Sequence, residues 1–286
     1  RQRIHPQPKT AKAYDPVYRT VYSRTADTVR PLVHALDSLR GGSAADDTEV
    51  KAAIPAEVII SPSLLACDWA DIRGEVRRCM EAGLKRLHVD IFDGVYLESP
   101  NAFTFGPKMV QAIRTSCDAS VTLDLHVCVH QPSRFVEPMA SAGADCFIFQ
   151  IEATKDPDEA IQLAEIIVEA GMGCGVSINP STPVDRVIPL LESGLIQTVD
   201  VLAVEPGFGG QTFQQIVLSK VRALRRWRES KGHTFDIMVD GGVNVETVQS
   251  ILDAGTDVLV AGSFLFGHPQ GLHFGARLLL AARELS

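Results

Sequence analysis

Histidine and aspartate side chains stand within segments of this chain that are otherwise apolar. His88 and Asp90 lie in LHVDIFDG, His126 lies in VTLDLHV, and Asp240 ends FDIMVD. An unpaired buried charge costs several kcal/mol, so such residues need a compensating partner. Two imidazoles and two carboxylates suit one divalent ion, which could be Zn²⁺, Fe²⁺, Mn²⁺ or Co²⁺. Asp93, which precedes a glycine in the first segment, is predicted to be a turn residue.

A regular alternation of short apolar runs with amphipathic stretches predicts the elements that position these residues. The runs are VIISPS, RLHVDIF, VTLDLHV, CFIFQIE, GCGVSIN, TVDVLAVE, FDIMVD and DVLVAG. Their nearly continuous apolar character is typical of parallel strands that are covered on both faces. Eight strand-then-helix units in residues 58–286 predict an α/β fold, the (β/α)₈ TIM barrel. A doubly wound open sheet is the alternative architecture.

A short repeat marks the expected ends of the helices. The tripeptides EAG (81–83), SAG (141–143), EAG (169–171), ESG (192–194) and DAG (253–255) each stand just before a strand. Glycine adopts the left-handed conformation at low cost and therefore closes the last turn of a helix. We interpret this repeat as structural.

Polar residues stand at the end of every predicted strand, where the strands of a barrel converge on one mouth. They are Ser63, His88 with Asp90, His126, Gln150, Asn179, Glu205, Asp240 and the pair Gly262–Ser263. His88 and Asp90 are two residues apart, so they face the same side of their strand. The convergence of these strand ends predicts the metal site.

Three glycine-rich loops follow the last three strands. They are EPGFGGQTF (205–213), DGGVN (240–244) and AGS (261–263). Glycines let backbone N–H groups approach a ligand closely, and in such barrels the loops after the seventh and eighth strands commonly hold phosphate. Three such loops on adjacent strands predict a phosphate-binding cup.

Composition narrows the class of protein. The formal net charge of −8 argues against broad nucleic-acid binding, and no apolar run is long enough to span a membrane. Six cysteines are scattered without a Cys-x-x-Cys pair, which predicts free thiols in a reducing compartment.

The N-terminal part of the chain differs in charge from the rest. Residues 1–40 hold eight Lys or Arg against three Asp, and GGSAADDTE (41–49) follows as a linker. We therefore expect residues 1–57 to be a basic N-terminal extension and linker, followed by the barrel in residues 58–286. Because the chain begins at Arg1, it is expected to be processed or a fragment. The basic start resembles a sequence left after, or following, a plastid or mitochondrial transit peptide, which predicts location in an organelle, with the cytoplasm as the alternative.

These motifs together resemble the ribulose-5-phosphate 3-epimerase family of ribulose-phosphate-binding barrels. SPSLLACD, HVDIFDG, DLHVCV, VEPGFGGQTF, VDGGVN and VAGS occur in order, from about Val58 to Gly267. The resemblance implies an isomerase of the pentose phosphate pathway. This enzyme inverts C3 of a ketopentose phosphate, converting D-ribulose 5-phosphate to D-xylulose 5-phosphate through an enediolate. Related decarboxylases carry lysine where this chain has Phe92, which disfavours decarboxylation.

The family assigns roles to the matched positions. His88, Asp90, His126 and Asp240 would hold one divalent metal ion, and Asp90 and Asp240 would also be the acid–base pair. The residues that would contact the substrate and its phosphate are Ser63, His126, Gly209, Gly210, Gly242, Gly262 and Ser263.

Several positions depart from the family pattern. Phe92, Cys128 and Leu202 replace methionines near the metal, Gln150 replaces a histidine at the end of the fourth strand, and the loop after Asp93 is longer than usual. These departures raise the alternative of a non-catalytic, epimerase-like structural subunit of a larger organellar assembly. As partners we expect a small phosphorylated sugar and no nucleic acid. We also expect either a homo-oligomer or docking into a larger complex through the extension.

Overall fold

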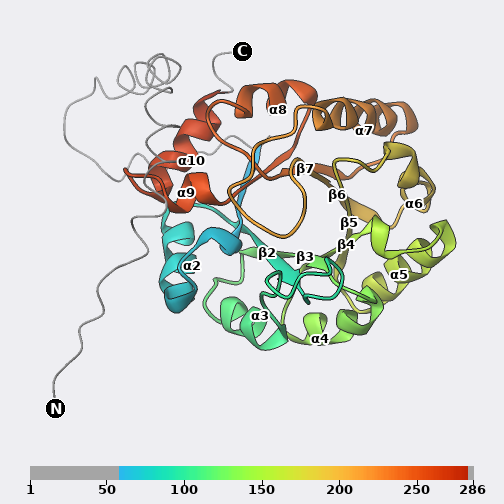
Figure 1. Cartoon of the computed structure of the whole chain (residues 1–286), viewed down its shortest axis with the longest axis horizontal. Coiled ribbons are helices and arrows are strands. Elements are labelled where there is room, and N and C mark those ends of the chain that lie inside the picture. Colours follow the sequence, from blue (N-terminus) through green and yellow to red (C-terminus); the bar gives the residue numbers. More distant parts are fainter. Residues whose placement is uncertain (1–57, 283–286) are drawn as a thin grey trace. The chain divides into compact units, whose positions relative to one another are not determined.

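Eight parallel strands form a nearly closed barrel in the computed structural model, which describes residues 58–282 (Figure 1). The strands are β1 (Ile59–Pro62), β2 (Arg86–Phe92), β3 (Thr122–Cys128), β4 (Cys146–Gln150), β5 (Gly173–Ile178), β6 (Ile196–Leu202), β7 (Asp236–Asp240) and β8 (Val258–Ala261). They pair in the order β1-β8-β7-β6-β5-β4-β3-β2. A parallel bridge between Ser63 and His88 links β1 to β2. The predicted (β/α)₈ barrel is confirmed, and the open sheet is excluded.

Helices surround the barrel on its outer face (Figure 1). They are α2 (Ile72–Glu81), α3 (Pro107–Arg114), α4 (Val136–Ser141), α5 (Pro157–Glu169), α6 (Ile188–Glu192), α7 (Val217–Lys231), α8 (Val248–Ala254), α9 (Ser263–Phe266) and α10 (Leu272–Ala281). Short 3₁₀ segments span Leu64–Ala66, Trp69–Asp71, Pro132–Phe135, Ile151–Ala153 and Val184–Arg186. None of the helices in residues 58–282 is long and apolar enough to cross a membrane.

The glycines of the predicted helix-end repeat adopt the expected backbone conformation. Gly83, Gly143, Gly171, Gly194 and Gly255 have φ between 74° and 100°. This is the left-handed region, in which a side chain would be strained. The repeat therefore ends helices, as predicted.

The inside of the barrel has an apolar middle layer between two polar ends. Buried side chains from β4, β7 and β8 form one apolar cluster, which consists of Cys146, Ile148, Met238, Val258 and Val260. The alternate residues of each strand face outward, and on β2 these are Leu87, Val89 and Ile91, which pack in the larger core with the helices. The polar residues of β2 consequently point into the barrel.

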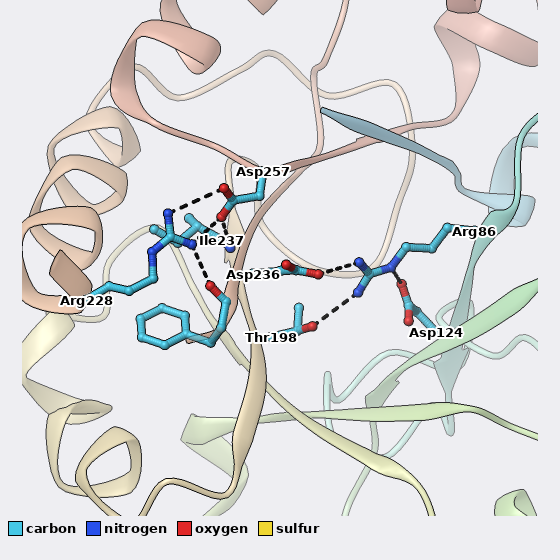
Figure 2. Close-up of polar contacts among 8 residues, drawn as sticks. Arg86, Asp124, Thr198, Arg228, Asp236, Ile237 and Asp257 are labelled. Atoms are coloured by element: carbon cyan, nitrogen blue, oxygen red, sulfur yellow. Dashed lines mark hydrogen bonds and ion pairs between the residues drawn. The ribbon is translucent and has the colours of Figure 1, made fainter. Parts of the chain in front are cut away.

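A partly buried arginine, Arg86, closes the end of the barrel at which the strands begin (Figure 2). Arg86 donates from Nε to Asp124 Oδ2 at 2.5 Å, from one terminal nitrogen to Asp236 Oδ2 at 2.6 Å, and from the other to Thr198 Oγ1 at 3.1 Å. Asp124 is completely buried, so its charge depends on this arginine. The contacts tie β2 to β3, β6 and β7 and thereby fix the strands whose other ends carry the predicted site.

A second arginine in Figure 2 joins the outer layer to the barrel. Arg228 of α7 pairs with Asp257 at 2.5 Å and donates to the carbonyl of Phe235, while Asp257 also accepts from the backbone N–H of Ile237 at 2.7 Å. These contacts fix the starts of β7 and β8 against α7.

The predicted extension and linker lie outside the described residues. The expectations of organelle targeting and of a docking arm, both of which fall on residues 1–57, stay predictions.

Removing the Arg86 guanidinium should strongly destabilise the barrel. We expect Arg86→Met to lower the free energy of unfolding by about 3–5 kcal/mol, because it leaves the buried Asp124 carboxylate without a counter-charge. Urea unfolding monitored by circular dichroism measures this loss. Arg225→Met is the matched control, because Arg225 pairs with Glu229 on an exposed helix face, where such a pair contributes about 0.3–0.5 kcal/mol. Equal losses in the two variants would contradict the structural role of Arg86.

Candidate metal and catalytic site

Four residues predicted as metal ligands come together where the strands end. His88 and Asp90 lie on β2, His126 on β3, and Asp240 is the last residue of β7. One nitrogen or carboxylate oxygen from each lies within 4.8 Å of the others. Parallel strands bring these side chains together because their carboxyl ends meet at one mouth.

Asp90 is the centre of this cluster. Its Oδ1 lies 3.0 Å from Nδ1 of His126 and 3.5 Å from Nε2 of His88. Its Oδ2 accepts a hydrogen bond of 2.8 Å from Oγ of Ser63. Nε2 of His88 is also 3.7 Å from Oδ2 of Asp240. Ser63, predicted to contact the substrate, therefore lies in the site and orients the Asp90 carboxylate.

The donor set fits a divalent cation. His88 is completely buried, yet neither of its ring nitrogens has a hydrogen-bond partner among the described residues. Such groups are rare, because an unsatisfied buried polar atom costs about 1–3 kcal/mol. Two imidazole nitrogens and two carboxylate oxygens form a set that Zn²⁺ and related ions prefer. An ion held by the cluster would give Nε2 of His88, which lies nearest the two carboxylates, the partner that it lacks.

The charges in the cluster shift the pKa of each member. Burial alone would lower the pKa of His88, but Asp90 and Asp240 raise it to about 10. Burial alone would raise the pKa of Asp90, but His88 and His126 hold it well below its usual range. Burial, with Asp90 nearby, raises the pKa of Asp240 to about 7. The two aspartates are thus in different protonation environments, as acid–base chemistry requires.

Residues that sequence reasoning did not include extend the cluster into the barrel. Asp200 of β6 is completely buried, accepts from Oγ of Ser177 at 2.9 Å, and leaves its Oδ1 without a partner. Burial raises the pKa of its carboxyl group. The available signal was the alternation in TVDVLAVE, which puts Asp200 on the same side of β6 as Leu202.

The loop after β2 covers the mouth with apolar side chains. Phe92 and Cys128 are buried in one cluster with Ala102, and Leu65, Tyr96 and Leu97 pack against it. Asp93 anchors this loop as the predicted turn residue, because its carboxylate accepts from the backbone N–H groups of Val95, Tyr96 and His130. The longer loop thus supplies an apolar cover where the sequence lacks methionines.

Two of the predicted phosphate-binding loops contact each other. A Cβ atom at Gly242 would lie 2.8 Å from Cβ of Phe213 and 2.9 Å from its backbone nitrogen, so only glycine fits there. Oγ1 of Thr247 donates to the carbonyl of Gly242 and fixes this turn. At Gly262, a Cβ atom would lie 3.0 Å from Cβ of Ala66, so the loop after β8 lies against the loop after β1.

Not every polar strand end joins the site. The Glu205 side chain is exposed and accepts from Gln214 at 3.3 Å, outside the ligand cluster. The backbone N–H of Asn179 donates to Glu152, which sits just after β4. Gln150 does join the site, through a contact with His126.

Without bound metal, the stability of the protein should fall as the pH rises from about 7 to about 10. The proton on His88 stabilises the fold fully below pH 6.5, and this stabilisation is lost as the pH rises through about 10. The raised pKa of Asp240 has the same sign at lower pH, because the fold favours its protonated form and loses that contribution between pH 3.8 and about 7. Each proton changes the free energy of unfolding by up to about 1.4 kcal/mol per pH unit.

Melting temperatures measured across this range in chelator should show the decline. The zinc-saturated protein should decline less, because metal binding displaces these protons. His88→Asn, which cannot titrate, should lose much of the decline in the metal-free state. A wild type whose metal-free melting temperature stays flat up to about pH 10 would contradict the expected protonation.

Comparisons with known proteins identify the family. The family model described as the ribulose-phosphate 3 epimerase family matches residues 59–266. Ribulose-phosphate 3-epimerase, cytoplasmic isoform, from Oryza sativa subsp. japonica is 42% identical over 216 residues, which cover 75% of this chain and 90% of that protein. Ribulose-phosphate 3-epimerase from Bacillus subtilis (strain 168) is 37% identical over 209 residues, which cover 73% of this chain and 92% of that protein.

Among solved structures, 3-hexulose-6-phosphate synthase from Salmonella typhimurium superimposes with a TM-score of 0.57 at 14% identity. The alignment covers 80% of this chain and 100% of that one. This likeness shows the fold alone. The family match and the identity to curated relatives confirm the predicted enzyme class, an isomerase. The chain belongs to the ribulose-phosphate 3 epimerase family.

Proposed function

We propose that this enzyme is a metal-dependent epimerase that inverts C3 of D-ribulose 5-phosphate to give D-xylulose 5-phosphate. The observation that carries the proposal is the approach of two carboxylates, Asp90 and Asp240, to one pair of histidines from separate strands. The names of its relatives support the substrate class.

Two-base proton transfer explains why the carboxylates lie on different strands. In the closed sheet, β2 and β7 are separated by β1 and β8, so Asp90 and Asp240 reach the mouth from different sides. A C3 atom between them presents one face to each carboxylate. One aspartate removes the C3 proton, and the other returns a proton to the opposite face, which inverts the carbon.

The remaining residues of the cluster prepare these aspartates. Ser63 and His126 hold the Asp90 carboxylate in one orientation. His88, Asp90, His126 and Asp240 would hold the divalent ion. When bound, this ion supplies positive charge that stabilises the enediolate formed on proton removal. The apolar cover around Phe92 and Cys128 excludes water, which strengthens these electrostatic interactions.

The glycine loops after β6, β7 and β8 would bind the substrate's phosphate. Within residues 58–282, the backbone N–H groups of Gly210 and Gly242 donate to no backbone acceptor. Together with Gly209, Gly262 and Ser263 they would provide backbone and hydroxyl donors for the phosphate anion.

The two-base mechanism predicts incorporation of solvent hydrogen at C3. Metal-loaded enzyme in heavy water should place deuterium at C3 of D-xylulose 5-phosphate as it forms, measured by NMR. Asp240→Asn should lower turnover by about 10²–10⁴-fold, because general acid–base catalysis contributes about that much. Metal content must be measured as well, because Asn replaces an anionic ligand.

Asp236→Asn controls for the loss of an aspartate from the same strand, since Asp236 pairs with Arg86 at the other end of the barrel. This variant should keep most of its turnover per folded molecule. If metal-loaded wild type places no deuterium at C3, the protein is not an active epimerase, and the alternative of a non-catalytic structural subunit stands.

A substitution in the loop after β6 should weaken substrate binding. Gly210 has φ +77° and open space at its Cβ position, so Gly210→Ala strains the loop and shifts its N–H groups without a clash. We expect the Michaelis constant for ribulose 5-phosphate to rise at least about tenfold. Gly194→Ala is the matched control, because Gly194 has φ +74° and equally open space but ends α6. Equal Michaelis constants in the two variants would show that the phosphate does not bind at the loop after β6.

A further inference from the structure

Gln150, the last residue of β4, contacts the ring of one proposed metal ligand. It is completely buried, and its Nε2 lies 2.8 Å from Nε2 of His126. The other amide atom, Oε1, is buried without a hydrogen-bond partner. The contact therefore connects β4 to the cluster formed by β2, β3 and β7.

The two nitrogens of the His126 ring face different partners. Nδ1 faces Asp90 Oδ1 at 3.0 Å and the rest of the ligand cluster, whereas Nε2 faces the amide of Gln150. A neutral imidazole carries one proton. With that proton on Nδ1, the ring donates to Asp90, and Nε2 accepts from the amide nitrogen of Gln150. The orientation of the amide in the structure, with Nε2 of Gln150 facing Nε2 of His126, fits this tautomer.

Metal binding through Nδ1 requires the opposite arrangement. A ligating nitrogen supplies its lone pair, so the proton must reside on Nε2, and the partner of Nε2 must then accept a hydrogen bond. Turning the Gln150 amide by about 180° puts its oxygen where its nitrogen was. A single glutamine can therefore satisfy His126 in both states.

We propose that Gln150 is a positioning residue that reverses its amide when metal binds and thereby holds His126 in the ligating tautomer. This inference rests on the proposed metal site. A partner on the second ring nitrogen fixes the orientation of a histidine ligand, and its loss typically lowers metal affinity 10–100-fold. A histidine at this position would also offer either a donor or an acceptor.

Two substitutions separate this role from simple packing. Gln150→Met keeps the length and shape of the side chain but cannot bond to the ring, so its affinity for zinc should fall about 10-fold or more. Gln150→His differs in shape but can still form a hydrogen bond with the His126 ring. The zinc affinity of this variant should therefore stay within about threefold of wild type. If Gln150 only fills space, Gln150→Met should bind zinc more tightly than Gln150→His does. Competition with a zinc chelator measures the affinities, and metal-free melting temperatures show that each variant folds.

Ile148→Val is the matched control. Ile148 precedes Gln150 by two residues on β4 and packs in the apolar middle layer of the barrel, so this variant should melt at a lower temperature with unchanged zinc affinity. Nitrogen-15 NMR of His126 in the wild type needs no variant, and it should show Nε2 gaining a proton when zinc is added.

An unprotonated Nε2 in the zinc complex, or wild-type zinc affinity in Gln150→Met, would overturn the inference. The C3 deuterium exchange of the wild type would stay as expected in that case, so the two proposals can fail separately. A wild type that binds no zinc would overturn the metal site together with this inference.

Discussion

Charge compensation around the buried carboxylate of Asp90 is the constraint on which the mouth of the barrel depends. This carboxylate accepts from Ser63 beyond β1, faces His126 of β3, and lies beside His88 on its own strand. Through His88 it is connected to Asp240 of β7. A carboxylate buried in a parallel barrel needs such partners, because removing its charge from water costs several kcal/mol. The same neighbours that compensate the charge create a donor set for a cation and a pair of carboxylates in different environments.

The two ends of the barrel interior have different roles, because one holds a structural network and the other holds the predicted site. At the end where the strands begin, Arg86 joins Asp124, Asp236 and Thr198 into a network that only holds strands together. At the other end, His88 and His126 lie beside the carboxylates, and the ring nitrogens of His88 have no hydrogen-bond partner among the described residues. The apolar layer between them separates the two sets of charges. At the opposite end, Arg86 offers a counter-charge to Asp124 and Asp236, so the carboxylates there do not depend on a cation bound at the mouth.

The residues that are expected to depart from the family pattern keep the physical properties that the predicted site needs. The resemblance leads us to expect flexible methionines where this chain has Phe92 and Cys128, and the loop after β2 packs Tyr96 and Leu97 against these two side chains. At Gln150, where the resemblance leads us to expect a histidine, the side chain still offers a group that can donate or accept beside His126. These departures therefore preserve the physical requirements of the site, namely an apolar cover and an oriented ligand ring.

The sequence by itself determined the strands, the helix ends and the family, and it predicted the four residues His88, Asp90, His126 and Asp240 that the structure brings together. Apolar runs, left-handed glycines and polar strand ends are local patterns, and parallel strands must bring their carboxyl ends together. Only the tertiary structure decided which distant side chains meet. Arg86 reaches Asp236 across 150 residues of chain, and Gln150 reaches His126 across 24. Barrel closure, shear and rotamers set such contacts, and none of these leaves a periodic pattern in one strand. For the same reason, Asp200 was visible only as a residue of an apolar run until its neighbour strand placed Ser177 beside it.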